Sequence, residues 1–438
     1  MMYATDLPYM PPKARRPATS HQPESNSSSR SRAPEILPGV PHRHEITPRS
    51  GQPLGILVKP SSADCNLNCE YCFYHERASD PYRNHEEEVS RASRHRMSDE
   101  TLDEFLSQWL PMAGPNPNVG WQGGEPTLAG LDFFRHVVKR QQELKDRRQT
   151  VSNSLQTNGV LLNDEWAEFL HEHRFLVGLS IDGPQELHDR YRFDYAGKGT
   201  FTRVMRAIDT MRKHDVEFNL LCVVNRLTAN HAESIYKFLT SEGFQWLQFI
   251  PAVERDSNGR VTPFSVTSKQ FGTFLCRMFD CWYEDGNPKV SVRLFDEILG
   301  IGTGQPAGSC QLNAVCGGLY VVVEHNGDIF PCDFFVEDRW KLGNVHSDKL
   351  TEMVRGDVIH RFAQIKPNAS KKCESCRFRG ICRNGCPHYR SLGDGKFLEL
   401  DYLCEGYYRF YSHAIPMMER LLRSNQHIDR SRNIEAVH

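Results

Sequence analysis

The stretch that decides the fold is "LGILVKPSSADCNLNCEYC", residues 54–72, in which an apolar run leads directly into three closely spaced cysteines. The apolar run, residues 54–59, has the length and composition of a buried β-strand. The thiols that follow, Cys65, Cys69 and Cys72, are one short of the four ligands that a structural zinc ion takes. The sequence therefore predicts a strand that ends in an incomplete set of metal ligands.

Short apolar strands alternate with segments of helical period over the next 200 residues. Further strands are predicted at residues 119–122, 150–157, 175–181, 218–224 and 246–253. Helices are predicted at residues 99–109, 131–146, 163–172, 200–214 and 230–242. This alternation indicates a parallel sheet with right-handed crossovers. Six βα units are too few for a closed eight-stranded barrel, so we predict an α/β fold with a partial (βα)6 barrel of the TIM type.

Polar loops that carry glycine follow the predicted strands. "QGGEPT" (122–127) follows the second strand, "QTNG" (156–159) the third and "SIDG" (180–183) the fourth. In parallel α/β folds the reactive groups lie beyond the carboxyl ends of the strands. We therefore expect these loops and the cysteine loop to form one active site.

Composition limits the classes of protein to consider. The 438 residues include 53 basic and 55 acidic side chains, so the net charge of -2 gives no sign of nucleic-acid binding. We expect neither a membrane span nor a secretion signal, because the sequence lacks the long apolar run and the apolar h-region that these require. The chain is expected to be cytoplasmic, where clustered cysteines suggest metal binding.

The chain divides into four predicted regions. Residues 1–50 are rich in Pro, Ser and Arg and are expected to form a disordered tail. Residues 51–290 form the barrel, and residues 300–412 form a cysteine-rich domain with a β-hairpin at 319–333 that turns at Asn326-Gly327. A helix is expected at about 405–422, and residues 413–438 are predicted to form the C-terminal helix and tail.

Eight of the 14 cysteines lie beyond residue 300, which is enough for two sets of four ligands. They are Cys310, Cys316, Cys332, Cys373, Cys376, Cys382, Cys386 and Cys404. Three others, Cys222, Cys276 and Cys281, lie in apolar strand or helix patterns and are expected to be ordinary buried thiols.

The Cys-x3-Cys-x2-Cys spacing of the first cluster lets three thiolates bind three corners of a 4Fe-4S cube. Clusters in electron carriers usually have four cysteines, so an open iron implies that a small molecule binds there. The alternative is a zinc site completed by His75 or by a distant residue, although zinc favours paired Cys-x2-Cys knuckles.

The motif "CNLNCEYC" resembles the signature of radical S-adenosylmethionine (radical SAM) enzymes. The resemblance implies that the methionine part of S-adenosylmethionine chelates the open iron and that the cluster cleaves this cofactor to a 5'-deoxyadenosyl radical. The residues that match the family's cofactor contacts are Tyr71, Gly123, Gly124, Glu125, Ser180, Arg192 and Val253. By this resemblance Tyr71 and Val253 contact adenine, the "GGEP" loop binds the amino group, and Ser180 and Arg192 contact the ribose and the carboxylate.

The distal cysteines resemble the SPASM extension of peptide-modifying radical SAM enzymes. This resemblance implies two auxiliary 4Fe-4S clusters with four protein ligands each, and three clusters in all. One set is Cys310, Cys316, Cys332 and Cys386, and the other is Cys373, Cys376, Cys382 and Cys404. A zinc ribbon is the alternative for Cys373 and Cys376 alone.

Asp333, in the context "PCD", resembles the general base of the anaerobic sulfatase-maturating enzymes. Such a carboxylate is ionised at neutral pH and accepts a proton if it lies beside the substrate. The alternative is an aspartate that caps a turn.

The subfamily resemblance implies oxidation of a cysteine or serine in an unfolded sulfatase segment of Cys/Ser-x-Pro-x-Arg type to formylglycine. A flavodoxin or a ferredoxin is the expected electron donor. Two alternatives stay open. One is a SPASM enzyme that makes thioether or carbon-carbon crosslinks in a ribosomal peptide, and the other is a non-catalytic iron-sulfur regulator.

Overall fold

The structure, a computed structural model, describes residues 54–74, 95–368, 370–393 and 395–435, with side chains described up to residue 423. The predicted disordered tail at residues 1–50 and the alternative zinc ligand His75 lie outside the described residues.

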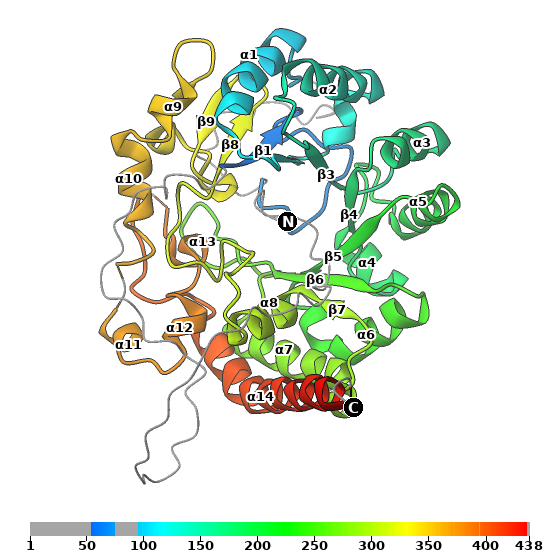
Figure 1. The fold of residues 1–438 in the computed structure, drawn as a ribbon, viewed down its shortest axis with the longest axis vertical. Coiled ribbons are helices and arrows are strands. Elements are labelled where there is room, and N and C mark those ends of the chain that lie inside the picture. Colours follow the sequence, from blue (N-terminus) through cyan, green and yellow to red (C-terminus); the bar gives the residue numbers. More distant parts are fainter. Residues whose placement is uncertain (1–53, 75–94, 369, 394, 436–438) are drawn as a thin grey trace.

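The barrel strands form one parallel series in chain order, as predicted. They are β1 (Gly55–Lys59), β2 (Asn118–Trp121), β3 (Ser152–Thr157), β4 (Leu176–Ser180), β5 (Phe218–Val224) and β6 (Trp246–Pro251). Figure 1 shows that these strands curve in an open arc with helices on its outer side. The observed bounds lie within about three residues of the predicted ones, because short apolar runs between polar loops mark buried strands clearly.

The five predicted helices of the barrel are all present. They are α1 (Asp99–Trp109), α2 (Leu131–Leu144), α3 (Asp164–Glu172), α5 (Phe201–Lys213) and α6 (Ala232–Ser241). Ser98 caps α1 by accepting a hydrogen bond from the backbone amide of Thr101 at 3.2 Å. The sequence prediction missed α4 (Gln185–Tyr191), α7 (Ser268–Tyr283) and α8 (Arg293–Gly302). A capping box of Thr267 and Gln270 marks the start of α7 and was a usable signal.

The predicted hairpin is present, but it belongs to the barrel sheet. Strand β8 (Tyr320–Glu324) pairs antiparallel with β9 (Asp328–Phe330) around Gly327. On its other edge β8 pairs in parallel with all five residues of β1. Two short strands, β7 (Ser291–Val292) and β10 (Gly343–Asn344), complete a ten-stranded sheet among the described residues. The sheet therefore continues across the predicted boundary between barrel and cysteine-rich domain.

Short helices and loops make up most of the remaining C-terminal region. The helices are α9 (Leu350–Met353), α10 (Asp357–Ala363), α11 (Lys371–Glu374), α12 (Arg379–Cys382), α13 (Pro387–Arg390) and α14 (Cys404–Glu435). Helix α14 begins one residue before the predicted start and continues past the predicted end at 422. The 3-10 turns are η1 (Leu110–Met112), η2 (Pro126–Ala129), η3 (Thr228–Asn230), η4 (Glu284–Gly286), η5 (Asp333–Phe335) and η6 (Asp338–Trp340).

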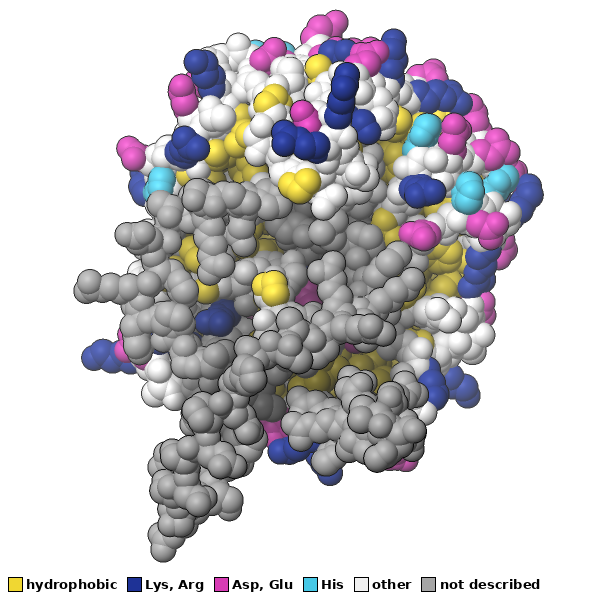
Figure 2. Space-filling model, in the orientation of Figure 1, with side chains coloured by type: hydrophobic (Ala, Val, Ile, Leu, Met, Phe, Trp, Pro, Cys, Tyr) yellow, Lys and Arg dark blue, Asp and Glu magenta, His cyan; other side chains and the backbone are white. Residues whose placement is uncertain are grey.

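The main hydrophobic core lies between the sheet and the helices that cover it, with Trp109, Trp121 and Trp282 fully buried. A second cluster joins Leu57 of β1 to Val322 of β8 and so extends the core under the hairpin. On the face shown in Figure 2, acidic and basic side chains alternate around the periphery. Among the described residues, no helix has both the length and the apolar character needed to cross a membrane.

The packing of α14 on α7 depends on a close contact between two glycines. A Cβ atom at Gly272 would lie 2.6 Å from the Cα of Gly406, and one at Gly406 would lie 2.3 Å from the carbonyl oxygen of Ser268. These partner atoms are backbone, so neither helix can relieve the overlap by rotating a side chain.

We predict that Gly272→Ala lowers the free energy of unfolding by about 1–3 kcal/mol, because the added methyl group forces the two helices apart. Thermal or urea denaturation measures this change. The matched control is Gly356→Ala, whose Cβ would meet its nearest neighbour at an ordinary 3.5 Å. Equal stability of the two variants would contradict the assigned packing.

Candidate active site

A cavity of about 150 Å³ lies at the carboxyl ends of the barrel strands. The thiols of Cys65, Cys69 and Cys72 line it. It also brings together five further residues that the sequence singled out, namely Tyr71, Gly123, Gly124, Ser180 and Arg192. The polar loops after β1 to β4 therefore meet at one site, as their places after parallel strands predict.

The loop after β2 fixes the backbone of the cysteine loop. The amide of Gly124 donates to the carbonyl oxygen of Ser62 at 2.8 Å, and the amide of Glu125 donates to that of Asp64 at 2.7 Å. A Cβ atom at Gly124 would lie 2.1 Å from the Asp64 carbonyl oxygen. Only glycine lets the two backbones approach this closely, so the "GGEP" loop holds the cysteine loop in place.

Glu125 is fully buried and does not line the cavity. Its carboxylate accepts hydrogen bonds from the amide of Thr127 at 3.0 Å, the hydroxyl of Thr157 at 2.7 Å and the amide of Asn158 at 2.8 Å. Burial raises the pKa of Glu125, and these hydrogen bonds oppose that shift. Through these contacts Glu125 connects the loops after β2 and β3.

Tyr71 and Arg192 form a buried network with Asp182, a residue that the sequence prediction missed. The Tyr71 hydroxyl donates to the carboxylate of Asp182, and Arg192 donates to the Tyr71 oxygen at 2.9 Å. Asp182 also accepts from the amide of Val223 at 2.9 Å. Burial raises the pKa of Asp182, and the charge of Arg192 opposes this shift. The available signal was the position of Asp182 within the quoted "SIDG" loop.

Burial is the largest influence on the pKa values of the three cavity thiols. It raises the pKa of Cys65 and Cys69, and together with the neighbouring Cys69 it raises the pKa of Cys72 to about 12. A metal centre binds thiolates, so metal binding here must release protons and supply the free energy to keep the charged thiolates buried.

Three buried polar atoms of the cavity walls suit a polar ligand. Nε of Arg192 and the Oε1 atoms of Gln122 and Gln156 have no hydrogen-bond partner within the described part of the chain. Nε2 of Gln156 donates to the hydroxyl of Ser180 at 3.1 Å. Because buried polar groups in folded proteins are nearly always bonded, these unpaired atoms fit a ligand that carries both donors and acceptors.

The predicted adenine contact Val253 lies just outside the cavity. Its side chain packs in the main core, whereas the preceding residues Pro251 and Ala252 line the cavity. With Val223 and Ile250 these residues form an apolar wall opposite the polar loops.

The distal cysteines lie in two groups. Cys373, Cys376, Cys382 and Cys404 line a second cavity of about 510 Å³. In the other set, burial raises the pKa of Cys310, and the neighbouring thiols of Cys316, Cys386 and Cys332 raise it further. Cys386 thus lies with the residues of the hairpin although its sequence neighbour is Cys382. Over the described residues, no three Cys, His, Asp or Glu side chains converge closely enough to hold a single metal ion.

The three remaining cysteines differ in burial. Cys222 and Cys276 are buried, as predicted, whereas Cys281 near the end of α7 is only partly buried.

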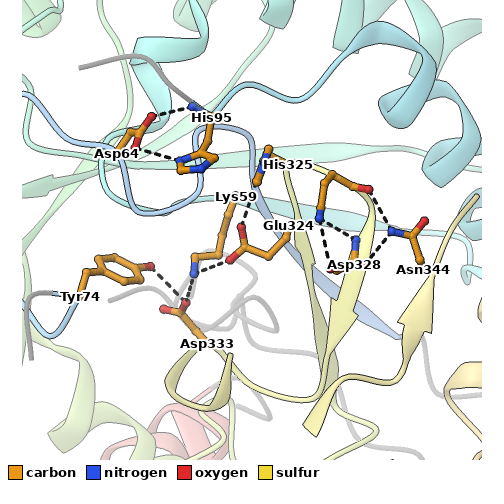
Figure 3. A network of polar contacts seen from close by, with 10 residues as sticks. Lys59, Asp64, Tyr74, His95, Glu324, His325, Asp328, Asp333 and Asn344 are labelled. Atoms are coloured by element: carbon orange, nitrogen blue, oxygen red, sulfur yellow. Dashed lines mark hydrogen bonds and ion pairs between the residues drawn. The ribbon is translucent and has the colours of Figure 1, made fainter. Parts of the chain in front are cut away.

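Asp333 is buried at the start of η5, next to the main cavity. Figure 3 shows its carboxylate between Lys59 and Tyr74. The Lys59 ammonium lies 3.3 Å from it, the Tyr74 hydroxyl donates to it at 3.2 Å, and the side-chain Nε2 of Gln122 donates to it at 3.0 Å. Tyr74 and Gln122 also line the cavity, so they connect Asp333 to the site of the three thiols.

Lys59 also pairs with Glu324, directly opposite it in the β1–β8 register. The ammonium and the carboxylate are 2.8 Å apart and neither side chain is exposed (Figure 3). Burial raises the pKa of Glu324, but Lys59 and hydrogen bonds from neighbouring side chains outweigh it, and the pKa falls to about 2. The sequence prediction missed both residues, because a lysine at the end of an apolar strand and a glutamate at a hairpin turn are ordinary surface residues until the strands pair.

The family models and the similar proteins that match this chain point to the same family. Residues 60–239 match the radical SAM superfamily, and residues 315–377 match the iron-sulfur cluster-binding domain SPASM. The cysteine-type anaerobic sulfatase-maturating enzyme of Clostridium perfringens is 38% identical over 371 residues, which are 84% of this chain and 97% of that protein. The serine-type enzyme of Bacteroides thetaiotaomicron is 37% identical over 84% of this chain and 91% of its own length.

Solved structures agree with this result. The structure described as "Native anSMEcpe with bound AdoMet and Cp18Cys peptide" superposes with a TM-score of 0.77 at 37% identity, covering 85% of this chain and 99% of that one. Streptococcus suis SuiB, at 17% identity and a TM-score of 0.57 over 80% of this chain and 77% of its own, shares the fold.

The depressed pKa of Glu324 predicts a specific pH dependence of stability. Because the folded pKa of about 2 lies below the ordinary value of 4.5, the ionised carboxylate stabilises the fold above about pH 4.5. This contribution is lost as the pH falls from about 4.5 to about 2. Glu324→Gln is therefore expected to lower the free energy of unfolding on the order of 3 kcal/mol at neutral pH, and by much less near pH 3.

Urea denaturation of both proteins across this range measures the difference. Glu352→Gln, at an exposed carboxylate on α9, is the control and should change stability little at any pH. A difference between wild type and Glu324→Gln that does not vary with pH would contradict the assigned ion pair.

Proposed function

The chain belongs to the anaerobic sulfatase-maturating enzymes, radical SAM oxidoreductases with a SPASM domain, and we propose that it oxidises a cysteine or serine of a sulfatase peptide to formylglycine. The observation that carries this proposal is the position of Asp333. Two of its hydrogen-bond partners, Tyr74 and Gln122, line the cavity that holds the three thiols. The proton acceptor is thus one hydrogen bond away from the cavity that the candidate cluster site lines.

We assign a 4Fe-4S cluster to Cys65, Cys69 and Cys72, with S-adenosylmethionine at its open iron. When bound there, these groups supply a reductive cleavage that yields a radical able to take a hydrogen atom from the peptide. The unpaired atoms of Arg192 and Gln156 support this assignment, since the amino acid and ribose parts of the cofactor carry matching polar groups.

The remaining cofactor contacts are assigned by position. The backbone at Gly123 and Gly124 receives the amino group, while Glu125 acts on the cofactor through the loops that it braces. Ser180 and Tyr71 contact the nucleoside, and the apolar wall of Val223, Ile250, Pro251 and Ala252 lies against adenine, with Val253 in the core behind it. The apolar wall excludes water from the adenine, and the loops fix the orientation of the cofactor.

Asp333 is the proposed general base. The oxidation removes a hydrogen atom from Cβ, a proton from the thiol or hydroxyl, and one electron, and it leaves a thioaldehyde or an aldehyde. Asp333 accepts the proton, while Lys59, Tyr74 and Gln122 orient its carboxylate. A thioaldehyde is then hydrolysed to the aldehyde of formylglycine.

The two distal sets of four thiols are assigned to two auxiliary 4Fe-4S clusters, which makes three clusters in the chain. Full protein ligation suits electron transfer better than substrate binding. We further propose a flavodoxin or a ferredoxin as electron donor and the cytoplasm as the compartment, because reduced clustered thiols require reducing conditions.

Asp333→Asn tests the base. The amide keeps the shape of the side chain but accepts a proton poorly, so aldehyde formation should fall at least about 100-fold while deoxyadenosine formation continues. The assay is mass spectrometry of a Cys-x-Pro-x-Arg peptide after anaerobic incubation with S-adenosylmethionine and a reductant.

Asp338→Asn, at an exposed aspartate five residues further on, is the matched control and should keep both activities. Undiminished aldehyde formation by Asp333→Asn would contradict its role as general base and leave it a structural role. A peptide that loses hydrogen without gaining a carbonyl group would instead indicate a crosslinking maturase.

Iron analysis tests the cluster assignments. Anaerobic reconstitution should give about 12 irons per chain, as three 4Fe-4S clusters require, and about eight after Cys65, Cys69 and Cys72 are replaced by alanine. Cys281→Ala removes a thiol that belongs to none of the sets and should leave the iron content unchanged. An iron content near four per wild-type chain would contradict the assignment of the two auxiliary clusters.

A further inference from the structure

Helices α11 and α12 lie at the outer edge of the molecule (Figure 1) and carry Cys373 and Cys382, which line a cavity together with Cys376 and Cys404. All four thiols are themselves partly exposed. Basic side chains and one aromatic side chain surround them. We call this surface the basic patch, and it consists of Lys371, Lys372, Arg377, Arg379 and Tyr408.

We propose that the basic patch is the docking site of a small acidic electron-carrier protein. The proposal rests on the proposed function in one respect, since it takes the neighbouring thiols to hold a redox group. For each catalytic cycle, one electron enters the chain for the cleavage of S-adenosylmethionine and one leaves on oxidation of the peptide. A one-electron carrier therefore serves as donor in its reduced form and as acceptor in its oxidised form.

Among the described residues, no carboxylate pairs with the positive charges of the patch. None of its four basic side chains forms an ion pair with another described residue, whereas arginines elsewhere on the surface, such as Arg135 and Arg140, are paired with carboxylates. Glu374 and Glu405 are the exposed acidic residues beside the patch, so basic groups outnumber acidic ones. In a chain of net charge -2 this local excess favours an acidic partner.

The patch has an aromatic anchor of the kind found at protein interfaces. Tyr408 is 48% exposed, and the guanidinium of Arg377 lies over its ring at 5.6 Å and over that of Phe378 at 4.5 Å. Arg377 also donates to the hydroxyl of Ser412 at 3.0 Å. Tyrosine and arginine are enriched at interfaces, and here both are held in place before a partner binds.

The cations beside the other distal set of thiols provide a comparison, because they are buried. Lys366 faces those thiols and is fully buried, donating to the carbonyl oxygens of Cys310 and Gln311 at 2.9 and 2.7 Å. Arg390 is buried in the same way and donates to backbone carbonyls. Lys371, Lys372 and Arg377 instead extend into solvent, where water and salt weaken their effect on a metal centre. Their exposure fits an external partner.

The test is a binding measurement with the reconstituted full chain and a bacterial flavodoxin as the probe. The patch variant carries Lys371→Glu, Lys372→Glu and Arg379→Glu. The control variant carries Lys139→Glu, Lys145→Glu and Arg147→Glu, an equal charge change on and after α2. We expect isothermal titration to show at least a tenfold loss of affinity for the patch variant, little loss for the control, and weaker wild-type binding as salt rises.

Iron content and the optical spectrum of each variant accompany the titration. Loss of binding with wild-type iron content supports the docking site, and loss of binding only together with loss of iron overturns it, because the basic residues then serve the metal site. Equal binding by the patch and control variants, or no binding by the wild type to flavodoxin or to a plant-type ferredoxin, also overturns it. The binding result stands apart from peptide oxidation, so a failure of the proposed function is recognised by the peptide product alone.

Discussion

The parallel pairing of β1 with β8 is the interaction on which the rest of the structure depends. Five residues of each strand are in register, and at the end of that register Lys59 meets Glu324 with neither side chain exposed. Removing one partner of a buried ion pair typically costs several kcal/mol, because a charge is left buried without compensation. This register also sets where the hairpin turns and returns, and so brings Asp333 against the cavity that the barrel loops form.

The barrel contributes a site built almost entirely from loops, and buried polar contacts keep those loops rigid. Glu125 holds the loops after β2 and β3 together, while Asp182 connects Tyr71 to strand β5. In a region of low dielectric each of these hydrogen bonds is costly to lose, so the network favours one arrangement of the loops. Three side chains that face the cavity, Arg192, Gln122 and Gln156, each have an unpaired polar atom among the described residues.

The two distal sets of thiols differ in their surroundings, and the difference separates an inner site from an outer one. The set around Cys310 lies under the hairpin with buried cations, whereas the set around Cys373 opens at the surface beside exposed cations. Cys386 belongs to the inner set although it follows Cys382 of the outer set by four residues. That exchange ties the C-terminal loops to the sheet.

The sequence by itself determined most elements of the barrel and the residue types of the candidate site, because both are local. Strand and helix periods, glycine-bearing loops and cysteine spacing are features of short stretches, which is why β1 to β6, the hairpin and the first cysteine cluster were predictable. The tertiary structure alone decided that β8 pairs with β1, that Lys59 serves both Glu324 and Asp333, and that Asp182 holds Tyr71. These contacts join residues more than 100 positions apart, and no local pattern marks such a residue, because its role depends on how the strands pair in space and not on its neighbours in sequence.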